Sequence, residues 1–568
     1  MDSPKSRGLI ISDFNTEALS GLLKNSPQLP AIEAEVIPFG QVLPVLLERG
    51  HPCWQKEYDF ILIWTQPDAV INAFQELTHF QPVTQETILS EVDEFAQAIL
   101  NITGHTRQIL IPTWTFPTFS RGLGILDVKS RRGIANTLMR MNLRLAETFE
   151  EVQNVHLLNA QKWIESTGKN SFNPKFWFLS KVPYDLQIFR EAVDEIKASL
   201  QTIRGESKKM IIVDLDNTLW GGTVGEIGWE SLILGGHDPI GEALVDFQKG
   251  LKALANSGII LGIASKNEES SALEAIQNHP EMVLRLTDFA GWRINWNDKA
   301  QNIVDLTQEL NLGLQSVLFI DDNPAERARV KEALPEVLVP DWPEDKMLYK
   351  KTLMGLKCFD SPALTAEDGR RTQMYQQEHQ RQAMRSRIGS LEDWLKTLNL
   401  RITVEKLSEA NLQRVTQLLN KTNQMNLSTR RMTENELWEW TNSKHRKLWT
   451  FRVADKFGDS GLTGLASLEI NGKIGTIVDF ILSCRVFGRK IEEAMLHTVL
   501  EHARAQQLDE VRARYIQTAK NKPCLDYLNT SPLRYDPHQD LYIGKAEQSF
   551  ALPDLLRAAM GNLKETET

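Results

Sequence analysis

The stretch "MIIVDLDNTLWGG", Met210 to Gly222, decides the fold of the middle of this chain. Its apolar run, residues 210–213, has the length and composition of a buried strand. Two aspartates, Asp214 and Asp216, follow directly at the end of that strand. Carboxylates this close repel each other, so chemistry explains their placement better than stability does. A divalent cation that prefers oxygen ligands, such as Mg²⁺, offsets that repulsion.

With such a cation, one aspartate can attack phosphorus as a nucleophile while the second handles the proton. Asp and Asn also populate ordinary loops after strands, so the motif by itself indicates phosphoryl transfer only weakly. Thr218 follows the pair and is a further candidate for contact with substrate.

Two more predicted strands of the same unit, residues 259–264 and 316–320, also end in polar groups. Carboxyl ends of parallel strands meet at one edge of a sheet, where open α/β folds bind ligands. A hydroxyl and loop amides there could hold a phosphoryl oxygen, and a lysine could neutralise phosphate. The candidates for this edge are Ser265, Lys266, Asn267, Lys299, Asp321 and Asp322.

In this order, the motifs resemble those of the haloacid dehalogenase-like (HAD) phosphohydrolases. The resemblance implies that Asp214 is the nucleophile and Asp216 the general acid and base. It implies a Mg²⁺ site formed by Asp214, Asp216 (through its carbonyl), Asp321 and Asp322. It also implies substrate contacts from Thr218, Ser265, Lys266, Asn267 and Lys299. An inactive relative that keeps a structural ion is the alternative, and the short interval from Asp216 to Ser265 predicts no sizeable cap domain.

Composition places the chain among ordinary globular proteins. Its 568 residues predict three or four domains, and its 42% hydrophobic and 24% charged residues fit packed cores. A net charge of −10 argues against wholesale nucleic-acid binding. We expect no membrane-spanning segment. The four cysteines are far apart and form no C-x-x-C pair, which predicts neither a disulfide framework nor a zinc site and fits a cytoplasmic location.

The chain is predicted to be a multidomain α/β protein with four parts: an α/β domain (1–203), the motif-bearing unit (204–358), a polar helical connector (359–396) and an α+β domain (397–568). In the first part, apolar runs at Gly8–Ser12, Phe60–Trp64, Gln108–Pro112 and Val155–Leu158 alternate with helical stretches at 86–101, 132–151 and 186–203. This alternation predicts a parallel sheet covered on both faces. In the last part, Asn471–Gly472 predicts a hairpin and residues 491–507 a helix.

The loop "SCRVFGRKIEEAML" in the last part suggests a second site. Loop amides and cations before a helix make a phosphate cradle, with Arg485, Gly488 and Arg489 as candidates. The loop resembles the acyl-CoA-binding pattern R/Q-x-x-G-x-G/A of the GNAT N-acetyltransferases, except that Lys490 replaces the last small residue. This departure argues against ordinary acetyl-CoA use and leaves room for a phosphopantetheine arm held differently.

Cys484 stands just before this loop, and the adjacent Arg485 favours its thiolate, the nucleophilic form. The alternative is a small buried hydrophobe. Cys358 is the rival nucleophile because it follows the motif-bearing unit directly.

The first part resembles the SGNH esterase-like domains. Ser12 precedes Asp13, however, instead of following a Gly-Asp pair, and no Asp-x-x-His stands near the domain's end. We therefore expect a non-hydrolytic domain that shapes a site or binds a partner.

Several motifs together resemble FkbH-like proteins: "DLDNTLWGGTVGEIG", "ASKNEE", "FIDDNPAER", "LTAEDGRR…MY", "NKTNQMNLSTRR" and "SCRVFGR". The resemblance implies an enzyme that removes the 3-phosphate of 1,3-bisphosphoglycerate and loads the glyceryl group as a thioester onto an acyl carrier protein. That unit then enters polyketide-type biosynthesis, with Cys484 the expected acyl carrier on the enzyme.

An acidic carrier protein would need a basic docking face, for which "TRRM", "KHRK" and "RVFGRK" are candidates, although these cations could equally be scattered surface charge. The alternative functions are a stand-alone small-molecule phosphatase, a non-catalytic docking module of an assembly line, and acyl transfer to an amine or sugar.

Overall fold

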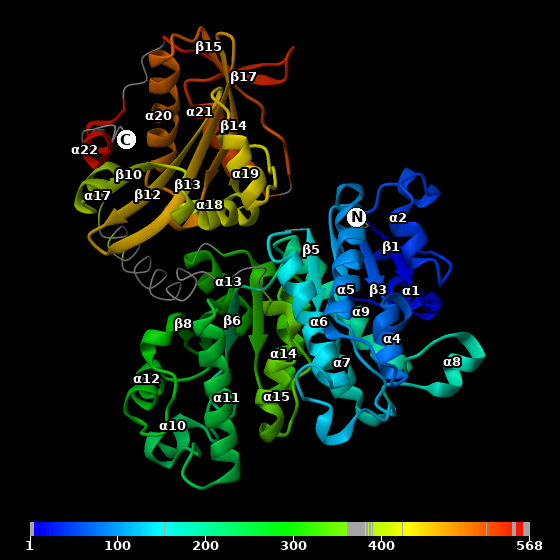
Figure 1. Ribbon diagram of the computed structural model, residues 1–568. Coiled ribbons are helices and arrows are strands. Elements are labelled where there is room, and N and C mark those ends of the chain that lie inside the picture. The colour runs from blue at the N-terminus through cyan, green and yellow to red at the C-terminus, as the bar shows by residue number, and fades with distance from the viewer. Residues whose placement is uncertain are drawn as a thin grey trace. The chain divides into compact units, whose positions relative to one another are not determined.

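The computed structural model describes residues 5–152, 154–310, 312–360, 381, 384, 388, 390–422, 424–518, 520–547 and 552–560. The chain divides into two compact units, Met1–Arg204 and Gly205–Thr568 (Figure 1). The second unit contains two separate sheets. Most of the predicted connector, 359–396, lies outside the described residues. Every described helix is too short or too polar to cross a bilayer.

The first unit is built on a five-stranded parallel sheet in the order β2-β1-β3-β4-β5. Successive side chains of a strand point to opposite faces. Leu9 and Ile11 accordingly lie in one apolar cluster and Ile10 in another. The strands are β1 (Ser6–Ser12), β2 (Ile32–Val36), β3 (Phe60–Trp64), β4 (Ile109–Pro112) and β5 (Val155–Leu158).

Helices cover both faces of this sheet (Figure 1), as predicted. They are α1 (Glu17–Asn25), α2 (Val42–Leu47), α3 (Pro67–Val70), α4 (Asn72–Thr78), α5 (Gln85–Leu100), α6 (Ile134–Phe149), α7 (Ala160–Thr167), α8 (Pro174–Ser180) and α9 (Leu186–Ile203). The three predicted helices correspond to α5, α6 and α9, within two residues at each end.

The motif-bearing unit has a four-stranded parallel sheet in the order β8-β7-β6-β9. Its strands are β6 (Met210–Val213), β7 (Ile260–Ser265), β8 (Phe289–Ile294) and β9 (Val317–Ile320). Strand β6 is fully buried on both faces, which explains its continuous apolar run. The helices are α10 (Val224–Ile227), α11 (Pro239–Asn256), α12 (Glu269–Asn278), α13 (Lys299–Glu309), α14 (Pro324–Ala333) and α15 (Tyr349–Met354).

The last part contains a mixed sheet in the order β10-β12-β13-β14-β15-β17-β16, with β11 paired to β14. The predicted hairpin is present, because Asn471 pairs with Ile474 across Gly472, whose φ is +61°. The strands are β10 (Arg401–Lys406), β11 (Met425–Asn426), β12 (Arg446–Asp455), β13 (Gly458–Asn471), β14 (Ile474–Leu482), β15 (Glu510–Ala513), β16 (Arg534–Asp536) and β17 (Leu541–Lys545).

The described helices of this part are α17 (Leu391–Thr397), α18 (Glu409–Lys421), α19 (Glu434–Thr441), α20 (Ile491–Ala505), α21 (Lys522–Thr530) and α22 (Asp554–Met560). The predicted helix at 491–507 is α20. Together the three sheets confirm the predicted multidomain α/β organisation.

Candidate active site

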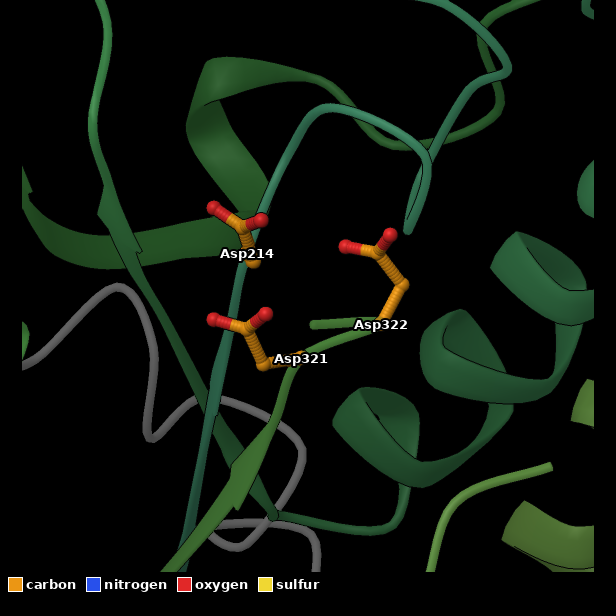
Figure 2. A group of neighbouring side chains, drawn as sticks. All are labelled: Asp214, Asp321 and Asp322. Carbon is orange, nitrogen blue, oxygen red and sulfur yellow. The ribbon is translucent and has the colours of Figure 1, made fainter. Parts of the chain in front are cut away.

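Three carboxylates converge at the carboxyl edge of the β6–β9 sheet. Asp214 directly follows β6, and Asp321 and Asp322 directly follow β9, the neighbouring strand. One oxygen from each lies within 4.8 Å of the others, and Figure 2 shows the three side chains gathered about one region. The parallel register of β6 and β9 brings these groups together, as the sequence predicts.

Lys299, the first residue of α13, lies between two of these carboxylates. Its Nζ is 2.6 Å from Oδ2 of Asp321 and 3.0 Å from Oδ1 of Asp214. Burial disfavours the ammonium, but the two carboxylates outweigh burial and raise the pKa of Lys299. The lysine is therefore a fixed positive charge within the cluster.

One lysine does not neutralise three carboxylates. Burial, reinforced by the charge of Asp214, raises the pKa of Asp321 to about 6 and also raises the pKa of Asp322. Oδ1 of Asp214 is buried and makes no well-oriented hydrogen bond, although the Lys299 ammonium lies nearby. Oxygen-only donors and a surplus of negative charge fit a hard divalent cation.

The backbone around the cluster is held by side chains. Arg327 donates to the carbonyl oxygens of Asp321 and Asp322, at 2.8 and 2.7 Å. Thr218, a predicted substrate contact, is fully buried; its hydroxyl accepts the N–H of Asp322 and donates to Oδ1 of that residue. These bonds fix the direction in which the carboxylates point.

The side chain of Asp216 lies outside the three-carboxylate group. Its Oδ1 accepts hydrogen bonds from Nε1 of Trp220, at 2.8 Å, and from the backbone N–H of Val224, at 3.1 Å. Burial raises the pKa of Asp216, while these bonds and one from Asn267 oppose the rise. A carboxyl group that holds its proton more readily suits a general acid.

The β7 candidates occupy the adjacent strand end. Ser265 is almost fully buried, and its Oγ accepts a hydrogen bond of 3.1 Å from Nδ2 of Asn267. Asn267 thus connects the serine to Asp216. Lys266 points elsewhere and pairs with Glu326 at 2.5 Å.

The chain between Asp216 and Ser265 adds no further domain. It forms a short flap, in which Gly221 and Ile233 exchange backbone hydrogen bonds of 2.9 Å, and then helix α11. The site therefore has no cap within this interval, as predicted.

A neighbouring turn contains a residue that the sequence did not reveal. Lys346 begins a short 3₁₀ turn, Lys346–Leu348, and its Nζ donates to Oδ1 of Asn217 at 3.3 Å. Asn217 has a left-handed φ of +56° and follows Asp216 directly. No motif in "PEDKMLYK" indicates this contact, which arises only from the tertiary fold.

The described residues of the predicted phosphate cradle in the last part do not form a cationic site open to a phosphate. Arg489 is fully buried and pairs with Asp455 at 3.2 Å, so its guanidinium is used in the interior. Lys490 takes a left-handed φ of +61° before α20, a conformation that favours glycine. Two glutamates, Glu492 and Glu493, occupy the first turn of α20, where a phosphate would otherwise gain from the helix dipole.

The other residues of this loop are placed as follows. Gly488 has a φ of +73°, and Arg485 Nε donates to Oγ of Ser483 at 3.3 Å. Cys484 begins the 3₁₀ turn Cys484–Val486, two residues after the last residue of β14, and its side chain lies outside the described parts of the structure.

The three cysteines with described side chains are poor nucleophiles. Burial raises the pKa of the Cys53 thiol to about 11, and of the Cys358 and Cys524 thiols to about 12. Because the thiolate is the reactive form, none of these residues is activated for attack at neutral pH.

Residues 425–427 of the amide-rich motif, 420–432, lie between two strands of the last sheet. Strands β14 and β15 pair over four residues and then separate. Met425–Asn426 pairs with β14 in the gap, Leu427 N–H donates to Phe480 O, and Ile516 N–H donates to Leu427 O. Nδ2 of the buried Asn521 donates to Asn426 O. This motif therefore has a clear structural role.

Most cations of the predicted docking face are already engaged. Lys444 and Lys447 are exposed. The arginines bind within the domain: Arg430 with Asp479, Arg431 with the carbonyl of Leu419, and Arg446 with Glu469.

In the first unit, Ser12 and Asp13 do not form an esterase-type pair. The Ser12 hydroxyl accepts the N–H of Phe14, and both oxygens of Asp13 accept hydrogen bonds from Gln66. That the first unit is non-hydrolytic stays a prediction.

Two solved structures show what the chain is similar to. The N-terminal part of a Bacteroides fragilis protein, which contains a phosphatase domain and is complexed with Mg, is similar over 64% of this chain and 95% of its own, with 28% sequence identity and a TM-score of 0.57. A GNAT-family acetyltransferase from Staphylococcus aureus is similar over 26% of this chain and 99% of its own, with 12% identity and a TM-score of 0.21. No protein-family model and no curated protein matches the chain.

Proposed function

We propose that this chain is a Mg²⁺-dependent phosphatase whose nucleophile is Asp214. The observation that carries the proposal is the convergence of Asp214, Asp321 and Asp322 around Lys299 at the carboxyl edge of a parallel sheet. The likeness to a phosphatase-containing structure complexed with Mg supports it. We assign the metal to the same three carboxylates.

In the proposed reaction, the carboxylate of Asp214 attacks phosphorus, and the bond from phosphorus to the ester oxygen breaks. Asp216 gives its proton to the departing alkoxide. Water then attacks phosphorus of the aspartyl phosphate, Asp216 takes a proton from that water, and inorganic phosphate leaves. The hydrogen bonds from Trp220 and Val224 hold Asp216 in place for both transfers.

Bound Mg²⁺ would supply positive charge that lets a phosphoryl dianion approach a carboxylate. Lys299 keeps Asp214 oriented, and Ser265 stands at the neighbouring strand end, where its hydroxyl can donate to a phosphoryl oxygen. These roles belong to residues that already lie together in the fold.

The finer proposal is that the phosphatase step belongs to a glyceryl transferase of the FkbH-like type. Its substrate would be 1,3-bisphosphoglycerate and its acceptor an acyl carrier protein, as the motifs of the sequence imply. We assign the acyl-carrying thiol to Cys484. The raised thiol pKa of Cys53, Cys358 and Cys524 supports this choice over its rivals.

In the transfer step, the Cys484 thiolate attacks the carbonyl carbon of the acyl phosphate. A carbon–sulfur bond forms, the carbon–oxygen bond to phosphate breaks, and phosphate leaves. The phosphopantetheine thiol of the carrier then attacks the thioester, takes the glyceryl group and returns the Cys484 thiol.

Intact-protein mass spectrometry of the chain with several holo carrier proteins, Mg²⁺ and 1,3-bisphosphoglycerate made in situ tests both steps. We expect a glyceryl adduct on one carrier and a parallel adduct on the enzyme. Cys484→Ala should abolish loading, while the matched variant Cys358→Ala should retain it. Phosphate release with every carrier unmodified would contradict the transferase and leave a stand-alone phosphatase. Full loading by Cys484→Ala would contradict only the assignment of the thiol.

A further inference from the structure

The cations around the carboxylate cluster differ in what they bind. Lys299 is shared by Asp214 and Asp321, Lys266 pairs with Glu326, and Arg327 donates to two backbone carbonyls. Each of these charges is committed to the protein itself. None of the three is therefore available for a substrate group far from the transferred phosphate.

Lys346 is different. Its Nζ donates to a neutral amide oxygen, Oδ1 of Asn217, at 3.3 Å, and within the part of the chain that the structure describes no carboxylate lies within 4.0 Å of it. The side chain is half-buried. A cation held by one long bond to an amide can exchange that bond for a charge-assisted one with little loss.

The turn that carries Lys346 is firmly placed. Asp345 caps it by accepting the N–H of Met347 at 2.9 Å. Tyr349 follows; its ring packs against Phe247 and its hydroxyl donates to Asn217 O at 3.4 Å. The turn that carries Lys346 is thus attached to Asn217, the residue that follows Asp216.

Lys346 lies beside the cluster without entering it. Burial and Asp214 raise the pKa of Asp322, and the charge of Lys346 opposes that rise. Its hydrogen bond goes to the loop after Asp216, three residues beyond Asp214. Asn217 adjoins Asp216, which in the proposed reaction gives its proton to the departing alkoxide, so Lys346 lies on the side of the residue that serves the leaving group, whereas Lys299 contacts Asp214 itself.

We propose that Lys346 is a specificity-determining residue that binds a second anionic group, a carboxylate or a second phosphate, on the leaving-group side of a phosphomonoester. This inference rests on the phosphatase function proposed above and assigns a residue of this chain to the recognition of the second anion. The group would replace the amide oxygen of Asn217 as the partner of Nζ.

Two nearly isosteric substrates provide the test. 3-Phosphoglycerate has a carboxylate where glycerol 3-phosphate has a hydroxymethyl group. With Mg²⁺-loaded full-length protein, we expect a higher kcat/KM for 3-phosphoglycerate. Lys346→Ala should reduce the ratio of the two kcat/KM values about tenfold, the typical effect of losing one charge-assisted hydrogen bond at a partly exposed site.

Two variants control this result. Lys346→Arg keeps the charge and should keep most of the ratio. Lys350→Ala removes a lysine one helical turn away, which pairs with Asp246 at 2.9 Å, and should leave the ratio unchanged.

The outcomes separate the inference from the function on which it rests. If Lys346→Ala lowers activity with both substrates equally, or if wild-type protein prefers neither, the inference is wrong and the phosphatase stands. If Lys346→Ala raised the Mg²⁺ concentration needed with both substrates equally, Lys346 would serve the metal site, and the inference would be wrong. If wild-type protein releases phosphate from neither compound nor from any other phosphomonoester, the proposed function itself fails.

Discussion

The chain contains two parallel sheets in which an aspartate follows a central strand, and they differ in what surrounds that residue. Asp13 follows β1, and its two oxygens accept hydrogen bonds from Gln66, at 2.8 and 3.1 Å. Asp214 follows β6 and meets two more carboxylates and a lysine. The first arrangement satisfies one buried carboxylate, whereas the second accumulates charge that needs a ligand.

The comparison shows that a strand ending in aspartate is not by itself a catalytic signal. Burial raises the pKa of Asp13 to about 6, much as it does for Asp321. A perturbed pKa is therefore common to both regions. What distinguishes the candidate site is convergence, because groups from β6, β7, β9 and α13 meet at one edge.

Replacing Asp214 should have the largest effect on activity and tests whether the carboxylate cluster differs in function from Asp13. Asp214→Asn should reduce phosphate release at least about a thousandfold, because the amide is not a nucleophile. The same change removes one of three repelling carboxylates, so the free energy of unfolding without metal should not fall. Steady-state phosphate release and urea unfolding measure the two effects. If Asp214→Asn kept more than a tenth of wild-type activity, Asp214 would not be the nucleophile.

Lys299 should matter to stability as well as to activity. Lys299→Met leaves buried Asp214 and Asp321 without their shared cation, which should lower the free energy of unfolding by about 3–5 kcal/mol in metal-free protein. Added Mg²⁺ should restore part of that loss. Hydrogen exchange of peptides from β6 and β9, with and without Mg²⁺, follows the change locally. If Lys299→Met left hydrogen-exchange protection of these peptides unchanged both with and without Mg²⁺, Lys299 would not stabilise the fold by balancing the charge of Asp214 and Asp321.

Asp13→Asn should raise the free energy of unfolding at neutral pH, whereas Lys299→Met lowers it. The folded-state pKa of about 6 lies above the ordinary value of 3.8, so the ionised carboxylate weakens the first unit as pH rises from about 4 to about 6. The neutral variant should therefore be more stable above pH 6, by about 2–3 kcal/mol, and equal to wild type below pH 4. Hydrogen exchange of β1 and β3 peptides across this range measures it. A variant less stable at pH 7 would mean that hydrogen bonding to Gln66 outweighs burial.

Lys266 should give the smallest effect. It was predicted to contact substrate, but its pair with Glu326 is about a third exposed, at 38% for the lysine side chain. Lys266→Ala should change kcat/KM less than about fivefold and stability by less than about 1 kcal/mol. Glu326→Gln is the matched control and should behave alike. A hundredfold loss of kcat/KM in Lys266→Ala but not in Glu326→Gln would show that Lys266 does contact substrate.

The sequence predicted the strands that carry the candidate site because they are buried on both faces. β6, β7 and β9 have continuous apolar runs, and their ends carry the polar residues that the fold brings together. β8, "FAGWRI", escaped prediction because Gly291 and the half-buried Arg293 interrupt its pattern. β2, "IEAEV", was also not predicted, because it lies at the sheet edge and its glutamates alternate with apolar residues instead of forming a continuous apolar run.

Tertiary contacts explain what the sequence did not predict. Arg489 has the spacing of a ligand-binding arginine, but its burial beside Asp455 depends on β12, far away in the chain. Lys346 reaches Asn217 across more than a hundred residues. Local patterns predict elements and strand ends, whereas the partner of a long charged side chain is decided only when separate elements pack.

Phosphate release from 3-phosphoglycerate by the full-length chain, with Mg²⁺ and with EDTA, tests most directly whether the carboxylate cluster is catalytic. We expect release that requires Mg²⁺ and disappears in Asp214→Asn, although that variant stays folded. Release that persists in EDTA or in the folded Asp214→Asn variant would contradict the assignment of the carboxylate cluster as the catalytic centre.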